Sequence, residues 1–130
     1  MGYAVAHPQV IATLEQVRLP YNLPSISLAA AQMVLEHRQL LLATIAETMS
    51  ERDRLFASLS QIDKLQVWRS DANFLYARII GANPDLAMTE LVAQLKLQGT
   101  LIRHTGGGLR ISIGSPAEND RTYQRIDRLL

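Results

Sequence analysis

Gly99-Thr-Leu-Ile-Arg-His-Thr-Gly-Gly-Gly-Leu-Arg-Ile-Ser-Ile-Gly114 is the stretch of the chain that decides the fold. Two short apolar runs, 100–103 and 109–113, flank three consecutive glycines, and this pattern predicts two strands joined by a turn. Each run carries one arginine, Arg103 or Arg110, whose guanidinium stays charged and offers a planar fork to a carboxylate or a phosphate. We therefore expect this stretch to hold a small, doubly anionic ligand.

The remaining elements complete the predicted fold. Residues 65–68 and 73–80 are expected to form two more strands that pair antiparallel, and residues 2–6 a short strand or strand end. Apolar residues at helical spacing, with Ser25 as an N-cap and a capping box at 115–118, predict the helices. These are expected over 8–17, 26–36, 38–59, 84–98 and 116–130. The fold class predicted is α/β in its α+β form: a mostly antiparallel sheet of about four strands, with helices packed on one face, preceded by a long helix.

Composition and charge narrow the function classes. The chain has 130 residues, 48% of them hydrophobic and 19% charged, which suits one soluble globular domain. A net charge of +1 gives no electrostatic reason to expect a nucleic-acid partner. The absence of cysteine excludes disulfides and thiolate chemistry. No apolar run approaches the roughly 20 residues that span a bilayer, and the chain opens with no signal-peptide core. We therefore expect no membrane partner and a cytoplasmic location.

Arg110 is the leading candidate for a ligand-binding residue. It alternates with Leu109 and Ile111, so its side chain is expected on the sheet face opposite to theirs. That face either meets solvent or borders a ligand cleft, and Arg103 presents the same two alternatives. The three glycines at 106–108 are either turn formers, which is the interpretation we favour, or a cradle of backbone amides for a phosphate.

Other polar residues are weaker candidates. Asn73 either hydrogen-bonds a ligand or terminates a turn, and Tyr21 with Asn22 either lines a pocket or forms a turn between prolines. No metal site is expected, because no two of the three histidines have ligand spacing on one helix. The two lysines, Lys64 and Lys96, are expected to be solvated, without a means of lowering their pKa for Schiff-base chemistry.

Five short motifs follow one another along the chain. They are Gly2-Tyr-Ala-Val-Ala-His-Pro8, Leu19-Pro-Tyr-Asn22, Ser70-Asp-Ala-Asn-Phe74, Gly99-Thr-Leu-Ile-Arg103 and Leu109-Arg-Ile-Ser-Ile-Gly-Ser-Pro-Ala-Glu-Asn-Asp120. In this order and at these intervals, the motifs resemble the C-terminal part of histidinol-phosphate aminotransferases. These enzymes are pyridoxal-phosphate (PLP) transaminases of fold type I. Each motif alone is modest, but the ordered set covers essentially the whole chain and makes the resemblance specific.

The resemblance implies a role for each candidate residue. The ligand would be a small phosphorylated amino acid or amino alcohol. Arg110 would bind the α-carboxylate of the substrate, and Arg103 would help to hold the phosphate end of histidinol phosphate. Asn73 would lie near the same cleft, and Tyr21 and Asn22 in the substrate or interface region. This sequence lacks the acidic residue that often follows the first arginine, and its glycine turn is shorter than usual. Both departures concern how the first arginine is positioned.

The resemblance also implies PLP as the cofactor of the full-length enzyme, with no catalytic or cofactor-binding residue in this chain. In the family, the lysine that binds PLP lies in a large cofactor domain, just upstream of the segment that matches Gly2-Tyr3. We therefore expect residues 1–24 to be the link from that domain and residues 25–130 to be the small domain. The isolated chain is expected to be an inactive fragment that does not bind PLP stably. The family forms homodimers, and exposed apolar surface would favour self-association here.

Three other functions stay open. Threonine-phosphate decarboxylase shares the fold and a phosphorylated amino-acid ligand, although the signature at 109–114 favours the transaminase. A stand-alone RNA-binding module is disfavoured by the near-neutral charge and by the lack of basic and aromatic residues alternating on a strand. A non-catalytic dimerisation domain would use the alanine-rich helix predicted at 26–36 as its contact surface.

Overall fold

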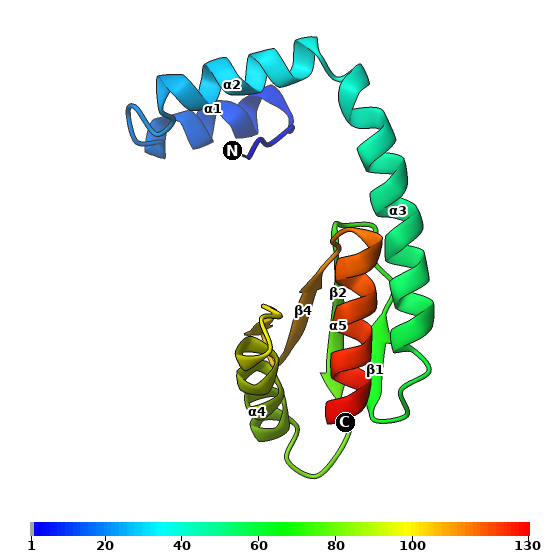
Figure 1. Cartoon of the computed structure of the whole chain (residues 1–130). Helices are drawn as coiled ribbons and strands as arrows, with labels where there is room; N and C mark the ends of the chain where they lie inside the picture. Colours follow the sequence, from blue (N-terminus) through cyan, green and yellow to red (C-terminus); the bar gives the residue numbers. More distant parts are fainter. Residues whose placement is uncertain (1) are drawn as a thin grey trace. The chain divides into compact units, whose positions relative to one another are not determined.

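The computed structural model describes residues 2–130 and divides the chain into two compact units, one ending at Leu42 and one from Ala43 to Leu130. The second unit contains an antiparallel four-stranded sheet (Figure 1). Its strands are β1 (Leu65–Trp68), β2 (Phe74–Ile79), β3 (Arg103–Thr105) and β4 (Gly108–Ser112), in the spatial order β1-β2-β4-β3. All three neighbouring pairs are antiparallel, as the sequence predicts.

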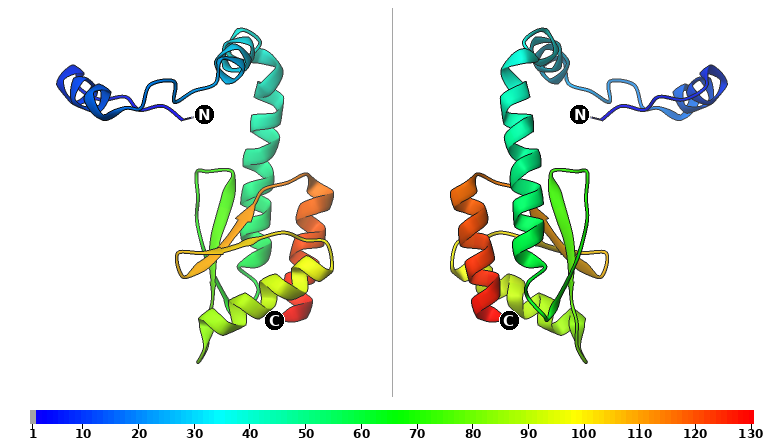
Figure 2. Two further views of the ribbon diagram at one scale, coloured as in Figure 1. Left: turned by 90° about the vertical axis from the view of Figure 1, so that its left-hand side faces the viewer. Right: turned by 90° about the vertical axis from the view of Figure 1, so that its right-hand side faces the viewer.

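Helices pack on one face of this sheet (Figure 2). They are the part of α3 (Gln39–Leu59) that follows Leu42, α4 (Pro84–Leu97) and α5 (Pro116–Leu129). The core lies between the two layers, and both layers contribute its most deeply buried side chains. These are Leu55, Leu59, Leu75, Ala77, Met88, Leu95, Leu109, Ile111 and Ile126. The prediction of helices on one face of the sheet is thereby confirmed.

Strand alternation separates the two faces of the sheet, because successive side chains of a strand point to opposite sides. Along β2, Leu75 and Ala77 are buried while Tyr76 is only half-buried. Along β4, Leu109 is buried and Arg110 is half-buried. We call the face turned away from the helices the outer face. By strand register it carries Trp68, Phe74, Tyr76, Arg78, Arg103, Gly108 and Arg110.

The first unit consists of two helices, α1 (Pro8–Val17) and α2 (Ser25–Glu36), together with the start of α3. His7 caps α1, because its Nδ1 accepts a hydrogen bond from the backbone N–H of Gln9. Neither α1 nor α2 contains a buried residue. The helices of this unit are therefore amphipathic or apolar segments that do not enclose a core of their own.

Most element boundaries agree with the prediction to within one residue, as for β2 and β4, and three differences concern residues 2–6, α2 and β3. Residues 2–6 form no strand, since the four strands of the described sheet all lie in the second unit. Helix α2 starts at Ser25 with Pro24 as the N-cap, one residue earlier than expected. The strand expected at 100–103 begins only at Arg103, because the backbone N–H of Thr100 still bonds the carbonyl of Leu95 and completes the end of α4.

The division of the chain into domains at residue 24 stays a prediction, since it concerns the architecture of a longer protein. The described structure instead groups residues by their mutual packing, and the boundary between its two units falls between Leu42 and Ala43. No helix within residues 2–130 combines the length and the apolar character needed to cross a membrane.

Candidate functional site

The two arginines of the glycine stretch face each other across neighbouring strands. Arg103 on β3 is the register partner of Arg110 on β4. Directly opposite residues of an antiparallel pair have Cβ atoms about 4.5–5.5 Å apart and side chains on the same face. Both side chains therefore leave the sheet at neighbouring positions of the outer face.

This arginine pair has no anionic partner in the described structure. Neither Arg103 nor Arg110 takes part in an ion pair within residues 2–130. The guanidinium carbon of Arg110 lies 4.2 Å from the centroid of the Phe74 ring, so the aromatic face supports one side of the cation. Like charges directly opposite on a sheet repel each other. A dianion bound at this pair would relieve the repulsion between the two guanidinium groups and would accept hydrogen bonds from both.

The glycine turn between β3 and β4 is tightly constrained. Gly106 and Gly107 have φ angles of +60° and +74°, the region that a two-residue hairpin turn of the primed type requires. A Cβ on Gly108 would lie 2.5 Å from Cζ of Tyr76, so only glycine leaves room for that ring. The interpretation of the three glycines as turn formers is confirmed. Gly106 and Gly107 supply the positive φ angles, and Gly108 supplies the space for the Tyr76 ring.

Tyr76 is a residue of this site that sequence reasoning missed. It is the register partner of Arg110 on β2. Its hydroxyl lies 2.6 Å from the carbonyl oxygen of Gly106 and 3.1 Å from that of Thr105, and it donates to this pair of acceptors. Its alternation with the buried Leu75 and Ala77 was the signal that could have placed it on the face of Arg110.

Asn73 does not lie with the arginine pair. Its carbonyl accepts a hydrogen bond of 2.9 Å from the N–H of Ile113, which extends the β2–β4 ladder by one residue. It precedes Phe74, so alternation turns its side chain away from the outer face. There it lines a recess with Thr48 and Met49 of α3. The structure therefore brings Arg103 and Arg110 together and leaves Asn73 on the other side of the sheet.

Tyr21 and Asn22 form a turn in the first unit. Tyr21 has a φ of +57° and is almost fully exposed. The Oδ1 of Asn22 accepts a hydrogen bond of 3.1 Å from Nη1 of Arg18. Asn22 also lines a hollow of this unit together with Tyr3 and Leu14. Both residues are thus accounted for by the local turn, and their predicted binding role stays a prediction.

His104 lies on the helix-covered face, although it is the neighbour of Arg103. It is the register partner of Leu109. Its Nδ1 lies 3.3 Å from Oγ1 of Thr89, and its Nε2 lies 3.9 Å from a carboxylate oxygen of Asp85, both on α4. Within residues 2–130 no group of three or more histidine, aspartate or glutamate side chains could hold a metal ion. His104 therefore links α4 with β3 and does not lie with the arginine pair.

A buried polar network holds the end of β4 in place. Asn119 on α5 accepts from the N–H of Gly114 and donates to its carbonyl, both at 3.0 Å. The same amide donates to Glu51 on α3 at 2.8 Å, and Arg54 donates to that carboxylate as well. These hydrogen bonds, that from Arg54 above all, lower the pKa of Glu51 below its ordinary value. The motif at 109–120 therefore contains both the strand that carries Arg110 and the asparagine that anchors its end.

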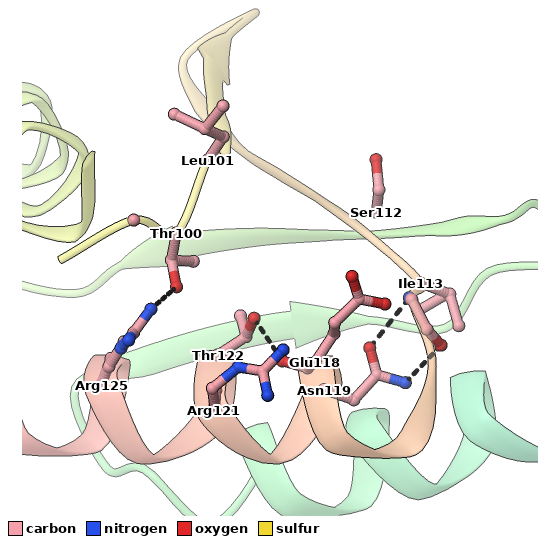
Figure 3. Close-up of a pocket in the computed structure, with 11 residues that line it drawn as sticks. Thr100, Leu101, Ser112, Ile113, Glu118, Asn119, Arg121, Thr122 and Arg125 are labelled. Atoms are coloured by element: carbon pink, nitrogen blue, oxygen red, sulfur yellow. Dashed lines mark hydrogen bonds between the residues drawn. The ribbon is translucent and has the colours of Figure 1, made fainter.

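A separate hollow lies between α5 and the chain segments that flank the glycine stretch (Figure 3). Arg125 closes one end, where its Nη1 donates to Oγ1 of Thr100 at 2.6 Å. The carboxylate of Glu118 lines the other part and accepts hydrogen bonds from the hydroxyl and from the backbone N–H of Ser115. These bonds, that from the hydroxyl above all, lower the pKa of Glu118. The predicted capping box of α5 is therefore present. The Ser115–Glu118 contacts cap the start of α5, and the Arg125–Thr100 contact ties α5 to the segment that follows α4.

Comparisons with known proteins show the family that this chain resembles. A model of the family "Aminotransferase class I and II" matches residues 1–126. The chain is 54% identical over 134 residues to the histidinol-phosphate aminotransferase of Trichodesmium erythraeum, covering 97% of this chain and 36% of the relative. It is 52% identical over 126 residues to the enzyme of the same name from Synechococcus elongatus, covering 97% and 33%. The chain thus spans about a third of the length of the curated relatives that it matches.

Solved structures share the fold at low sequence identity. A putative aminotransferase from Burkholderia pseudomallei superimposes with a TM-score of 0.72 at 23% identity, over 92% of this chain and 37% of that one. The L-threonine-O-3-phosphate decarboxylase of Porphyromonas gingivalis gives a TM-score of 0.74 at 20% identity, over 95% and 39%. At these identities the likeness concerns the fold alone.

Proposed function

This chain belongs to the aminotransferase class I and II family, and we propose that it is the substrate-binding, C-terminal part of a PLP-dependent transaminase that acts on histidinol phosphate. In this reaction histidinol phosphate and 2-oxoglutarate become imidazole-acetol phosphate and glutamate. The observation that carries the proposal is the cross-strand pair of Arg103 and Arg110, which share one face and have no anionic partner in residues 2–130. The relatives named histidinol-phosphate aminotransferase support the choice of substrate.

The arginine pair suits both halves of such a reaction. A phosphate monoester carries a charge close to −2 at neutral pH and presents three acceptor oxygens. Glutamate and 2-oxoglutarate present two carboxylates instead. Arg110, with its guanidinium stacked on Phe74, binds the α-carboxylate of glutamate or 2-oxoglutarate, since histidinol phosphate is an amino alcohol without a carboxylate. Arg103, which is exposed at the sheet edge, binds the phosphate end of histidinol phosphate. The two arginines thereby orient the substrate and exclude uncharged analogues.

We assign no PLP site to the described residues. When bound, this cofactor supplies the electron sink for transamination, and a lysine must lie beside it. Lys64 donates to the carbonyl of Leu130, and Lys96 lies in the last turn of α4, so neither belongs to the outer face. We therefore assign substrate recognition to this chain and cofactor binding to the part of the relatives that it does not match. A PLP absorbance band that survives dialysis of this chain, and bleaches on borohydride reduction, would contradict that assignment.

The first unit carries an apolar surface through which this chain could meet the rest of a longer protein. Helices α1 and α2 bury no residue, yet they carry apolar side chains such as Val17, Met33 and Leu35 at 64–76% exposure. Exposed apolar surface of this extent is typical of an interface. Residues 1–24 would form the link to the cofactor domain, and residues 25–130 the small domain. In the whole protein this surface would meet that domain or the second subunit of a homodimer.

A chimera tests the proposed function directly. In it, this chain replaces the segment that it matches in the Trichodesmium erythraeum relative. The chimera is expected to transaminate histidinol phosphate with 2-oxoglutarate. Replacing Arg110 by glutamine should lower kcat/KM for 2-oxoglutarate about 100-fold, because the α-carboxylate of this substrate then lies desolvated without its partner. Arg78→Gln is the matched control: this arginine is also on the outer face but faces Gln66 in the register, and its loss should leave the rate unchanged.

The outcomes separate the alternatives. Full activity of the Arg110→Gln chimera would contradict the assigned role of this residue. Release of carbon dioxide from threonine phosphate, without transamination of histidinol phosphate, would favour the decarboxylase that shares the fold. A chimera that binds PLP but turns over neither substrate would contradict substrate recognition by this chain.

A further inference from the structure

We propose that Tyr76 is a positioning residue for the arginine pair. Its hydroxyl fixes the turn between β3 and β4, and this turn determines the position of Arg103 relative to Arg110. This inference rests on the proposed function, because it concerns the anion that the pair binds.

The first observation is the pair of hydrogen bonds from one side chain to the turn. The hydroxyl of Tyr76 lies 2.6 Å from the carbonyl oxygen of Gly106 and 3.1 Å from that of Thr105. Its backbone belongs to β2, the central partner of β4, whereas the turn belongs to the edge of the sheet. A single rigid side chain therefore ties the outermost part of the sheet to its interior across β4.

The second observation is the space that the chain keeps free for this ring. A Cβ on Gly108 would lie 2.5 to 2.7 Å from three atoms of Tyr76, and one on Gly106 would lie 3.4 Å from its hydroxyl. Glycine in a strand often marks such a close approach, because it weakens the strand otherwise. The ring of Trp68, with its centroid 5.7 Å away, packs beside Tyr76 and limits its motion. Both sides of the phenol are thus constrained.

The third observation is the weakness of the strand that the phenol holds. β3 has only three residues and lies at the sheet edge, where it pairs with β4 alone. One of its three register pairs is Arg103 with Arg110, in which two cations repel each other. The contact to the carbonyls of Thr105 and Gly106 opposes this repulsion from two residues away. Without these hydrogen bonds, part of the free energy of anion binding would be spent on ordering the turn, so the anion would bind more weakly.

Phosphate titration of the whole 130-residue chain tests this inference. Tyr76→Phe removes only the hydroxyl and keeps the ring. We expect inorganic phosphate to bind about three- to tenfold more weakly to this variant, which corresponds to one lost hydrogen bond. In nuclear magnetic resonance spectra, the amides of Gly106 and Gly107 should show lower order parameters, and the Nε–Hε signal of Arg103 should shift. The melting temperature should change little.

Tyr123→Phe is the matched control, since Tyr123 packs against the core, away from the outer face, and its hydroxyl makes no hydrogen bond within residues 2–130. It should leave phosphate affinity and the turn amides unchanged. If Tyr76→Phe binds phosphate as the wild type does, and Arg110→Gln does not bind it, the positioning role is overturned and the proposed function stands. If the wild type binds no phosphate, the proposed function fails. The turn amides then decide alone: unchanged order parameters in Tyr76→Phe overturn the inference, and lowered ones support it.

Discussion

The two units of this chain differ in what they bury. The second unit encloses thirteen buried hydrophobic side chains between its sheet and its helices. None of residues 2–42 is buried, although α1 and α2 carry many apolar side chains. Full burial of one such side chain contributes about 1.5–3 kcal/mol to folding. The second unit therefore contains the interactions that keep its strands and the arginine pair in place, whereas the helices of the first unit gain that contribution only when another surface covers them.

Hydrogen exchange is expected to give the largest contrast between the two units. Backbone amides of α1 and α2 should exchange almost as fast as in an unfolded peptide, because isolated helices of this length are marginal in water. Amides of β2 and β4 that bond within the sheet should open only with the whole unit, at a cost of about 5 kcal/mol or more. Exchange followed by mass spectrometry measures both. Equal protection in the two units would show that the first unit is covered in solution, for example by a second copy of the chain.

Truncation of core and surface leucines sharpens the same comparison. Leu109 is completely buried, and Leu109→Ala should lower the free energy of unfolding by about 2–5 kcal/mol. Leu14 on α1 is half-exposed, and Leu14→Ala should change it by no more than about 0.5 kcal/mol. Urea unfolding, followed by the fluorescence of Trp68 in β1, reports on the second unit in both variants. A large effect of Leu14→Ala would mean that the first unit contributes to the stability of the second.

The anchor of β4 is expected to have a smaller but clear effect. Asn119→Ala removes both hydrogen bonds to Gly114 and one to Glu51, which leaves buried polar atoms without a partner. The free energy of unfolding should fall by about 1–3 kcal/mol. Asn83→Ala is the control, since Asn83 at the start of α4 makes no capping hydrogen bond with its side chain. Comparable losses in both variants, measured by urea unfolding, would contradict the anchoring role of Asn119.

The same anchor should make the second unit sensitive to acid. Hydrogen bonds from Arg54 and Asn119 lower the pKa of Glu51 below its ordinary value of 4.5. As the pH falls below that value, the unfolded chain binds a proton at this carboxyl before the folded chain does, so stability decreases. Glu51→Gln should flatten this part of the pH dependence in urea unfolding between pH 7 and pH 3. An unchanged slope would show that other carboxyls, such as Glu118, carry the acid sensitivity.

Strand alternation and turn chemistry predict much of the second unit. The pattern of Leu109, Arg110 and Ile111 places the arginine opposite the core, and the three glycines predict the turn. The convergence of Arg103 with Arg110 depends on strand register, which follows from long-range pairing that local patterns leave open. The same limit applies to Asn73, whose place on the other face follows from where β2 begins. The contact of Tyr76 with Thr105 and that of Asn119 with Glu51 join residues 29 and 68 positions apart, which no local pattern brings together.

The smallest effect concerns the stability cost of the arginine pair itself. Replacing Arg103 by glutamine removes one of two cations that oppose each other on β3 and β4, so the free energy of unfolding should rise by about 0.2–1 kcal/mol at low salt. The gain should shrink as salt screens the repulsion. Arg78→Gln removes a cation whose register partner is Gln66 and should bring no gain. Added phosphate should stabilise the wild type and not Arg103→Gln, because only the intact pair binds the dianion. A loss of stability in Arg103→Gln without phosphate would mean that the Arg103 side chain stabilises the fold by packing. The repulsion between the two arginines would then not limit the stability of the second unit.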